Sequence, residues 1–274
     1  MNTAELEALF AQTLVGGYED EAGWAAVDTL RRSGSREIFE QAAAWCVSGN
    51  PLKRARGAAI LCELRKESAP RAAGEKREWP EPEWMFRAES YPLITKMLER
   101  EQDPLVLDSA ISALGHLDNA EAIPLILSYQ DHSDESVRFA VTFALGCFPD
   151  NPQSVSGLLK LTSDADKDVR NWAVFGLGVQ GDADSPAIRE ALLRCLDDTN
   201  EEVREEAAVG LGKRHDQRIL PTLQTMLDQP VLKVRVAEAA AALLGLDEDP
   251  PEWAAADYRA ALTGKFGISP PALD

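Results

Sequence analysis

A ten-residue phrase that returns at a nearly constant interval constrains the fold of this chain more than any other feature. Its copies begin at Val106, Val137, Val169, Val203 and, more loosely, Val234, so that successive starts lie 31, 32, 34 and 31 residues apart. A fixed period of this length is typical of stacked supersecondary units rather than of one closed core. The pattern therefore predicts an array of helical repeats along the second half of the chain.

Each repeat reads as two helices that are joined by a polar turn. In residues 151–179, apolar residues at helical spacing form the first helix, and Asp166 after the turn can cap the second helix, which ends near Gly178. The first, fifth, eighth and ninth positions of the phrase share one face of that second helix, which we expect to be buried. The fifth copy departs because Glu238 falls on the buried face, so either the register shifts there or the array ends.

The two ends of the chain fit the pattern less well, as expected for the end units of a repeat array. Helices are predicted over 3–15, 21–32 and 36–48, and Ala55-Arg56 takes the place of the Val-Arg pair in a degenerate copy. Prolines exclude a helix between Trp79 and Trp84. We predict one domain, 1–274, with these parts: degenerate repeats 1–66, an inserted loop 67–86, regular repeats 87–246, and a C-terminal cap and tail 247–274.

The phrase Val-Arg-x-x-Ala-x-x-Ala-Leu-Gly, with an Asp before it, resembles the HEAT repeat, and within that superfamily the bacterial repeats of the phycobilin-lyase type. The resemblance covers residues 88–246 well and 20–66 weakly. It implies an all-α fold, a right-handed α-α superhelix of about six to seven helix pairs. In HEAT repeats the Arg and the preceding Asp commonly form a structural ladder. The matching residues here are Arg138, Arg170, Arg204 and Arg235, with Asp131, Asp164, Asp197 and Asp228. Leu107 should interrupt the ladder.

The charge of the chain is strongly acidic and uneven. The 28 basic and 46 acidic residues give a net charge of -18, and residues 101–274 alone hold 14 basic and 30 acidic groups. Such a field repels phosphate backbones and anionic membranes and favours a partner with a basic surface. The sequence shows no signal peptide and no apolar run of membrane-spanning length, and its four cysteines have no disulfide or metal spacing. We expect a cytoplasmic protein that binds neither nucleic acid nor membrane.

The sequence contains none of the familiar catalytic or metal-binding patterns. None of His116, His132 and His215 lies four residues from another ligand-type residue on a helix. HEAT-fold deoxyhypusine hydroxylases carry His-Glu pairs at the third and fourth positions of the phrase, where this chain has no histidine. There is also no phosphate-binding loop and no nucleophile beside a histidine. The sequence predicts a non-catalytic protein with no metal and no cofactor.

Aromatic residues at the third and seventh positions of the phrase indicate where a partner binds. These positions point away from the buried face, and second helices usually line the concave side of such arrays. We expect a concave strip there, because exposed apolar patches usually mark contact sites. Its residues are Phe139, Phe143, Asn171, Trp172, Phe175, Glu205 and Val209. Burial of the rings against one another is the alternative. Trp79 and Trp84 of the inserted loop are a weaker second candidate.

The function that fits these features best is a scaffold or adaptor that binds a protein or peptide, with a basic surface, on its concave face. An inhibitor or immunity protein acting against a basic toxin is a sharper version of this prediction. The alternative from another class is a small-molecule or chromophore-handling protein like the phycobilin lyases, for which the sequence shows no dedicated residue.

Overall fold

The computed structural model describes residues 2–66, 82–246 and 252–267 of the chain. Within these ranges there are fifteen α-helices and one two-stranded ribbon, which confirms the predicted all-α fold. The chain divides into two compact units, Met1–Ala144 and Leu145–Asp274, and their boundary falls inside one helix, α8. In the described ranges, no helix has both the length and the apolar character that crossing a bilayer requires.

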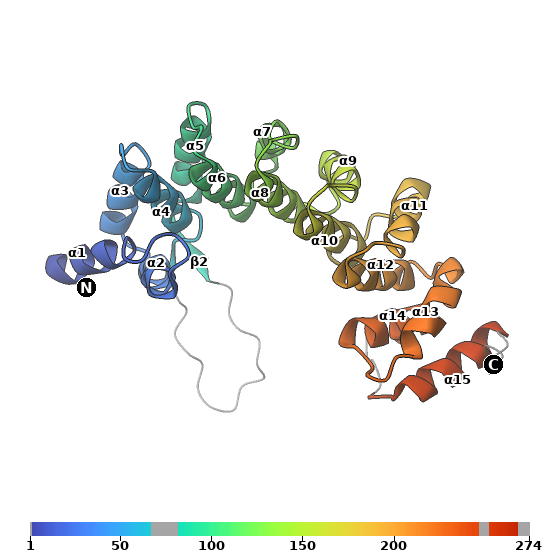
Figure 1. Ribbon diagram of the computed structural model, residues 1–274. Coiled ribbons are helices and arrows are strands. Elements are labelled where there is room, and N and C mark those ends of the chain that lie inside the picture. Colours follow the sequence, from blue (N-terminus) through green and yellow to red (C-terminus); the bar gives the residue numbers. More distant parts are fainter. Residues whose placement is uncertain (1, 67–81, 247–251, 268–274) are drawn as a thin grey trace. The chain divides into compact units, whose positions relative to one another are not determined.

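Unit 1 is built from helices in which even-numbered members lie side by side. Helix α4 packs between α2 and α6, while α3 lies against α4 and α5 against α6 (Figure 1). The elements of this unit are α1 (Thr3–Gln12), α2 (Glu21–Ser33), α3 (Arg36–Trp45), α4 (Pro51–Leu61), β1 (Arg65–Lys66), β2 (Glu83–Trp84), α5 (Arg87–Leu98), α6 (Pro104–His116), η1 (Ala120–Ala122), α7 (Ile123–Leu127) and the greater part of α8 (Glu135–Gly146).

Unit 2 repeats the arrangement, with α12 packed between α10 and α14 and the first helix of each pair beside its second helix (Figure 1). Its elements are α9 (Pro152–Leu161), α10 (Lys167–Phe175), the π-helical turn η2 (Gly176–Gln180), α11 (Pro186–Cys195), α12 (Glu201–Lys213), η3 (Gln217–Ile219), α13 (Leu220–Leu227), α14 (Val234–Leu244) and α15 (Ala255–Phe266).

The N-cap residue sets the register of each second helix. Asp103, Asp134, Asp166 and Asn200 precede α6, α8, α10 and α12, and each side chain accepts a hydrogen bond from a backbone N–H of the first turn. The third residue after each cap is the valine that opens the phrase. Those four valines are fully buried, as predicted: Val106, Val137, Val169 and Val203.

Two predicted registers are wrong, and the cap explains both. The N-cap of α14 is Lys233, so the helix begins at Val234, which is 73% exposed. The third residue after this cap is Val236, and it is buried. In α4 the N-cap is Asn50. The arginine four residues after the cap, which is the place of the Arg in the regular copies, is therefore Arg54 and not Arg56. Ala55-Arg56 and Val234-Arg235 therefore match the phrase in residue type, but they lie at a different distance from the N-cap than the matching pairs of the regular copies.

The insertion begins and ends in a short antiparallel ribbon that the sequence did not indicate. Arg65 pairs with Trp84 and Lys66 with Glu83, and the Met85 N–H donates to the Leu64 carbonyl. The prediction of a loop over 67–86 is therefore wrong for residues 83 and 84, which form β2. Four backbone-paired residues close the base of the insertion against α2.

Glycines allow α12 to approach its neighbours closely in unit 2. A Cβ atom on Gly210 would lie 2.7 Å from Cα of Gly178, and a Cβ on Gly212 would lie 2.5 Å from the carbonyl oxygen of Ala239. Both distances are far below van der Waals contact, so these two positions of the phrase require glycine for packing.

Candidate functional site

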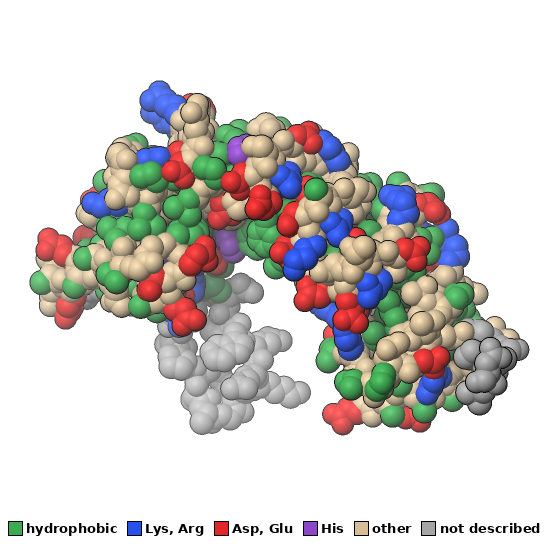
Figure 2. Space-filling view, viewed as in Figure 1, with side chains coloured by type: hydrophobic (Ala, Val, Ile, Leu, Met, Phe, Trp, Pro, Cys, Tyr) green, Lys and Arg blue, Asp and Glu red, His purple; other side chains and the backbone are tan. Residues whose placement is uncertain are grey.

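A groove of about 340 Å³ in unit 1 brings together several positions that the sequence singled out. We call it the α6–α8 groove, because α6 and α8 supply more than half of its lining residues. The lining residues are Tyr18, Trp24, Arg31, Ala59, Cys62, Asp108, Ser109, Ser112, Ala113, His116, Phe139 and Phe143. The space-filling view shows acidic side chains beside apolar ones over the elements of this unit (Figure 2). The groove is thus an apolar hollow with polar groups at defined points.

Helical spacing places the side chains that α6 and α8 contribute. Asp108, Ser112 and His116 follow one another at intervals of four residues on α6, and Phe139 and Phe143 do so on α8. Residues four apart lie on the same face of a helix. Both phenylalanines are half-buried, and the ring of Phe143 lies 5.1 Å from that of His116. They therefore form a wall of the groove and are neither fully exposed nor part of the deep core.

Tyr18 and Trp24 form another part of the wall, and they are held from behind by a buried arginine. The guanidinium carbon of Arg56 lies 4.9 Å from the Tyr18 ring centre and 4.4 Å from that of Trp24. Arg56 is fully buried and donates hydrogen bonds to the backbone carbonyls of Thr13, Gly17 and Tyr18. The segment between α1 and α2 is thereby fixed, and with it the position of the Tyr18 ring.

The two basic side chains that line the groove, Arg31 and His116, add little net charge to it. Arg31 forms an ion pair with Glu63 at 2.6 Å and donates to the Ala59 carbonyl at 2.8 Å. Burial lowers the pKa of His116 below its usual value, although nearby Glu63 opposes the shift. His116 is therefore neutral at pH 7, and the charge of Arg31 is balanced by its partner.

Asp108 is the group in the groove whose charge is not balanced. Within the described part of the chain, no side chain or backbone group donates a hydrogen bond to its carboxylate, and no cation pairs with it. Burial, with smaller contributions from the carboxylates of Glu19 and Asp134, raises the pKa of Asp108 to about 6. At pH 7 the groove therefore holds a partly desolvated negative charge that the described residues do not compensate.

The predicted strip residues of unit 2 lie on α10 and α12, and all but one of them are at least partly exposed. The rings of Trp172 and Phe175 make an edge contact at 5.7 Å, and both are half-buried. Asn171 lies beside them, and its buried Oδ1 accepts no hydrogen bond from the described residues. Glu205 is held by Lys233 at 2.6 Å. Val209 was expected on this surface, which is wrong: it is 4% exposed, because the α14 helix packs against α12.

The weaker candidate, the insertion, is only partly visible. Trp79 lies outside the described residues. Trp84 on β2 is 36% exposed, and the guanidinium carbon of Arg87 lies 4.2 Å from its ring centre. One face of the Trp84 ring is therefore covered by a side chain of the same unit.

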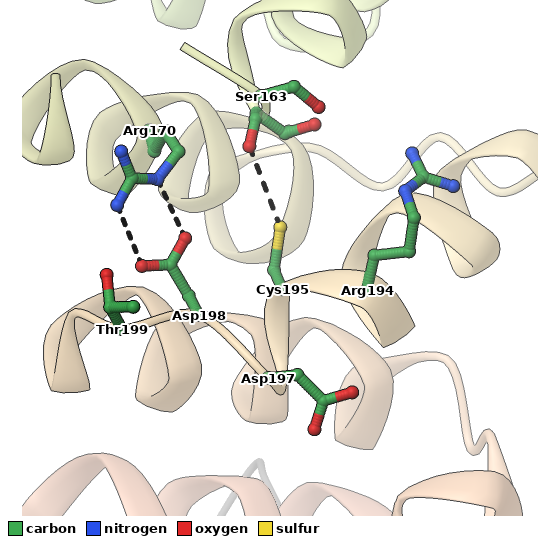
Figure 3. A pocket seen from close by; sticks show the side chains of 8 residues that line it. Ser163, Arg170, Arg194, Cys195, Asp197, Asp198 and Thr199 are labelled. Atoms are coloured by element: carbon green, nitrogen blue, oxygen red, sulfur yellow. Dashed lines mark hydrogen bonds and ion pairs between the residues drawn. The ribbon is translucent and has the colours of Figure 1, made fainter. Parts of the chain in front are cut away.

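The arginines of the phrase have the structural role that the resemblance implied, although some of their partners differ. Arg170 forms two hydrogen bonds with Asp198, at 2.7 and 2.9 Å, and also donates to the carbonyls of Asp164 and Ala165. In the hollow shown in Figure 3, Asp197 and Arg194 point away from this pair. The predicted ladder acid Asp197 is thus replaced by its neighbour.

We use the name clamp for this arrangement, in which an arginine binds an acidic residue of a later segment and the backbone carbonyls of the turn before its own helix. A clamp is also found in unit 1, at Arg54, which lies four residues after the N-cap Asn50. Arg54 binds Glu101 with two hydrogen bonds, at 2.7 and 3.0 Å, and donates to the Ser48 carbonyl. Arg138 and Arg204 make the equivalent bonds to backbone carbonyls five and six residues before them. Arg235 departs, since it pairs with Glu206 and Glu238, while Asp228 pairs with Arg259.

Sequence reasoning missed Tyr18, Trp24 and Arg31, because they lie outside the repeated phrase. One available signal was spacing: Trp24 and Arg31 are seven residues apart, which puts them on one face of α2. The described residues contain no group of three His, Cys, Asp or Glu side chains placed to hold a metal ion.

Comparison with known proteins gives a consistent result for the fold. A family model described as HEAT repeats matches residues 91–178 and 155–244, together more than half of the chain. The Escherichia coli protein YibA is 23% identical, with 98% of this chain and 93% of that chain covered and a TM-score of 0.70. An engineered protein is 17% identical, with 97% and 72% covered and a TM-score of 0.53.

The complex of CpcE and CpcF of phycocyanin lyase from Nostoc sp. PCC7120 is 16% identical, with 96% of this chain and 95% of that chain covered and a TM-score of 0.46. None of the curated proteins matches this sequence. At these identities the likeness to solved structures shows the fold alone.

Proposed function

Because the chain belongs to the family of HEAT-repeat proteins, we propose that it is a non-catalytic scaffold that binds a protein or peptide with a basic surface. The observation that carries this proposal is the α6–α8 groove, where Asp108 lies uncompensated among the rings of Phe139 and Phe143. A concave apolar site with a few placed polar groups is the usual form of a binding site. An inhibitor of a basic toxin would be one protein of this kind.

Charge supports the basic character of the partner. The chain has a net charge of -18, and Glu19 and Asp134 add to the negative potential at Asp108. Such a field accelerates encounter with a cationic surface and disfavours nucleic acid and anionic membranes as partners.

A second contact area is proposed in unit 2, formed by Asn171, Trp172, Phe175 and Glu205. The buried Oδ1 atom of Asn171 without a described donor supports this, since buried acceptors are normally hydrogen-bonded. Aromatic side chains such as Trp172 and Phe175 are also enriched at the centre of many interfaces. Trp84 is the weaker candidate, because one face of its ring is already covered.

The test is capture of a partner on the full-length protein, followed by cross-linking and mass spectrometry to locate the contact. Ser112→Trp fills the groove without removing a core side chain, and Phe139→Ser with Phe143→Ser removes its wall. Val47→Ser, at a position that is 86% exposed and outside the groove, is the matched control. We expect both groove variants, and not the control, to lose the partner while far-ultraviolet circular dichroism is unchanged.

Cross-links confined to other surfaces, or full binding by Ser112→Trp, would contradict the proposal. The alternative of a chromophore-handling protein is tested on the same preparation by native mass spectrometry and visible absorption, which would reveal a bound small molecule. A cytoplasmic location is part of the proposal, supported by the buried thiols of Cys46, Cys62 and Cys195; burial raises the pKa of Cys46 to about 12.

A further inference from the structure

We propose that the α6–α8 groove receives the guanidinium group of an arginine side chain of the partner, with the Asp108 carboxylate as its ion-pair acceptor. This inference rests on the proposed function and names the chemical group that is recognised. The aromatic walls are the rings of Tyr18, Trp24, Phe139 and Phe143, which come from three separate segments of unit 1.

The state of the Asp108 carboxylate favours a cationic ligand. It is half-buried, two further carboxylates lie near it, and within the described ranges it has neither a donor nor a cation as partner. A carboxylate in such a position raises the free energy of the unbound protein, and a cationic group that enters the groove relieves this cost. The missing partner is therefore a cation that carries hydrogen-bond donors.

Among biological cations, guanidinium suits an aromatic-lined groove best. Guanidinium is planar, weakly hydrated and able to stack on aromatic rings while it donates two parallel hydrogen bonds to a carboxylate. In the described part of this unit, four arginines lie over aromatic rings, and one of them, Arg36, also donates two hydrogen bonds to a carboxylate, that of Glu89. Arg56 lies 4.4 Å from the Trp24 ring centre, Arg87 lies 4.2 Å from that of Trp84, and Arg36 lies 4.2 Å from that of Phe86. An ammonium group is compact and strongly hydrated, so it suits this groove less well.

The other charged and titratable groups of the groove are compatible with an incoming cation. Arg31 on α2 is paired with Glu63, and His116 on α6 is neutral at pH 7. Burial raises the pKa of Tyr18 to about 12, so its phenol is also neutral. Glu19, from the segment before α2, and Asp134, from the segment before α8, are the remaining charges near Asp108, and both attract a cation.

Binding of guanidinium by Asp108 should depend on pH in a defined direction. Asp108 must be ionised to pair with guanidinium, so affinity should be highest above about pH 6 and fall as the pH is lowered through the pKa of this carboxyl. In the complex, the pKa of Asp108 should fall, because a nearby cation favours the charged form.

The experiment uses three short peptides on the full-length protein: acetyl-Gly-Arg-Gly-amide, its lysine counterpart, and its citrulline counterpart, which has the same shape without the charge. Carbon-detected nuclear magnetic resonance follows the Asp108 carboxyl during titration with each. Asp108→Asn is compared with Glu121→Gln, which removes one exposed carboxylate of the same unit outside the groove.

We expect the arginine peptide to bind most tightly, to lower the pKa of Asp108, and to lose at least about tenfold in affinity in Asp108→Asn, as for a charged hydrogen-bonded pair. Glu121→Gln should change affinity less than about twofold. Equal binding of the citrulline peptide, an unchanged affinity in Asp108→Asn, or no binding of the arginine peptide would overturn the inference. The scaffold proposal would still stand if Ser112→Trp abolished partner capture while Asp108→Asn did not.

Discussion

Replacing Asp108 by Asn should make the unbound protein more stable at neutral pH. The substitution keeps the size of the side chain and removes a charge that no described residue compensates. Most substitutions of half-buried groups destabilise a protein, so a gain in stability is a demanding result. It is expected here because binding sites often retain groups that are unfavourable until a ligand arrives.

The magnitude follows from the pKa of Asp108, which burial raises from the usual 3.8 to about 6. A raised carboxyl pKa means that the folded protein binds the proton more tightly than the unfolded chain does. The free energy of unfolding therefore falls as the pH rises from about 4 to about 6, and the deficit persists above that range. Two pKa units correspond to about 3 kcal/mol. Residual solvent access to this half-buried group reduces the expected gain to about 1–3 kcal/mol.

The assay is urea unfolding, followed by circular dichroism, of the wild-type protein, Asp108→Asn and Glu121→Gln at about pH 7 and about pH 4. The Asn variant should unfold at higher urea than the wild type at the neutral pH, and the two should converge at the acidic pH, where Asp108 is protonated. Glu121→Gln should follow the wild type. An Asn variant that is less stable at neutral pH would refute the reasoning, because it would show that the carboxylate accepts stabilising hydrogen bonds.

Further predictions concern packing and the clamp. Gly212→Ala should lower the free energy of unfolding by about 1–3 kcal/mol, because its methyl group would meet the Ala239 carbonyl. Gly264→Ala, in open space on α15, should raise it by about 0.5–1 kcal/mol. Thermal unfolding measures both changes, and equal effects would contradict the packing argument. Asp198→Asn should cost about 1–3 kcal/mol at neutral pH, because its hydrogen bonds with Arg170 lower the pKa of Asp198. That contribution exists above the unfolded-state pKa and disappears as the pH falls through the folded-state value, so chemical unfolding of wild type and variant should converge in acid; a constant difference would argue against the ion pair.

The repeats were predictable because both the repeat period and the buried face of a helix can be read from the local amino-acid sequence. The opening valines of four copies, from Val106 to Val203, are buried as the helical spacing required. The prediction failed where a helix begins at a different distance from the phrase. Lys233 precedes α14 directly, so Val234 became exposed although it reads like the other copies. Counting from the cap, rather than matching letters, corrects this register.

The groove was predictable only in part, for a physical reason. Asp108, Ser112, Phe139 and Phe143 fall at the third and seventh positions of the phrase, and the structure places all four in the lining of the groove. Tyr18, which also lines the groove, comes from a segment nearly a hundred residues earlier in the chain. Contact between segments so far apart depends on tertiary packing, which no local period encodes. The uncompensated state of Asp108 likewise became visible only with its surroundings.

The clamp described above bears on how such a chain can change its length. The segment that supplies Asp198 to the preceding arginine also supplies Arg204, which reaches back to the Asp198 and Thr199 carbonyls as Arg170 does to its own turn. A duplicated segment would therefore carry both an acidic residue for the arginine of the preceding repeat and an arginine for an acidic residue of the following repeat. Genes for such chains can grow or shrink by unequal recombination in whole periods, without a new joint having to evolve each time.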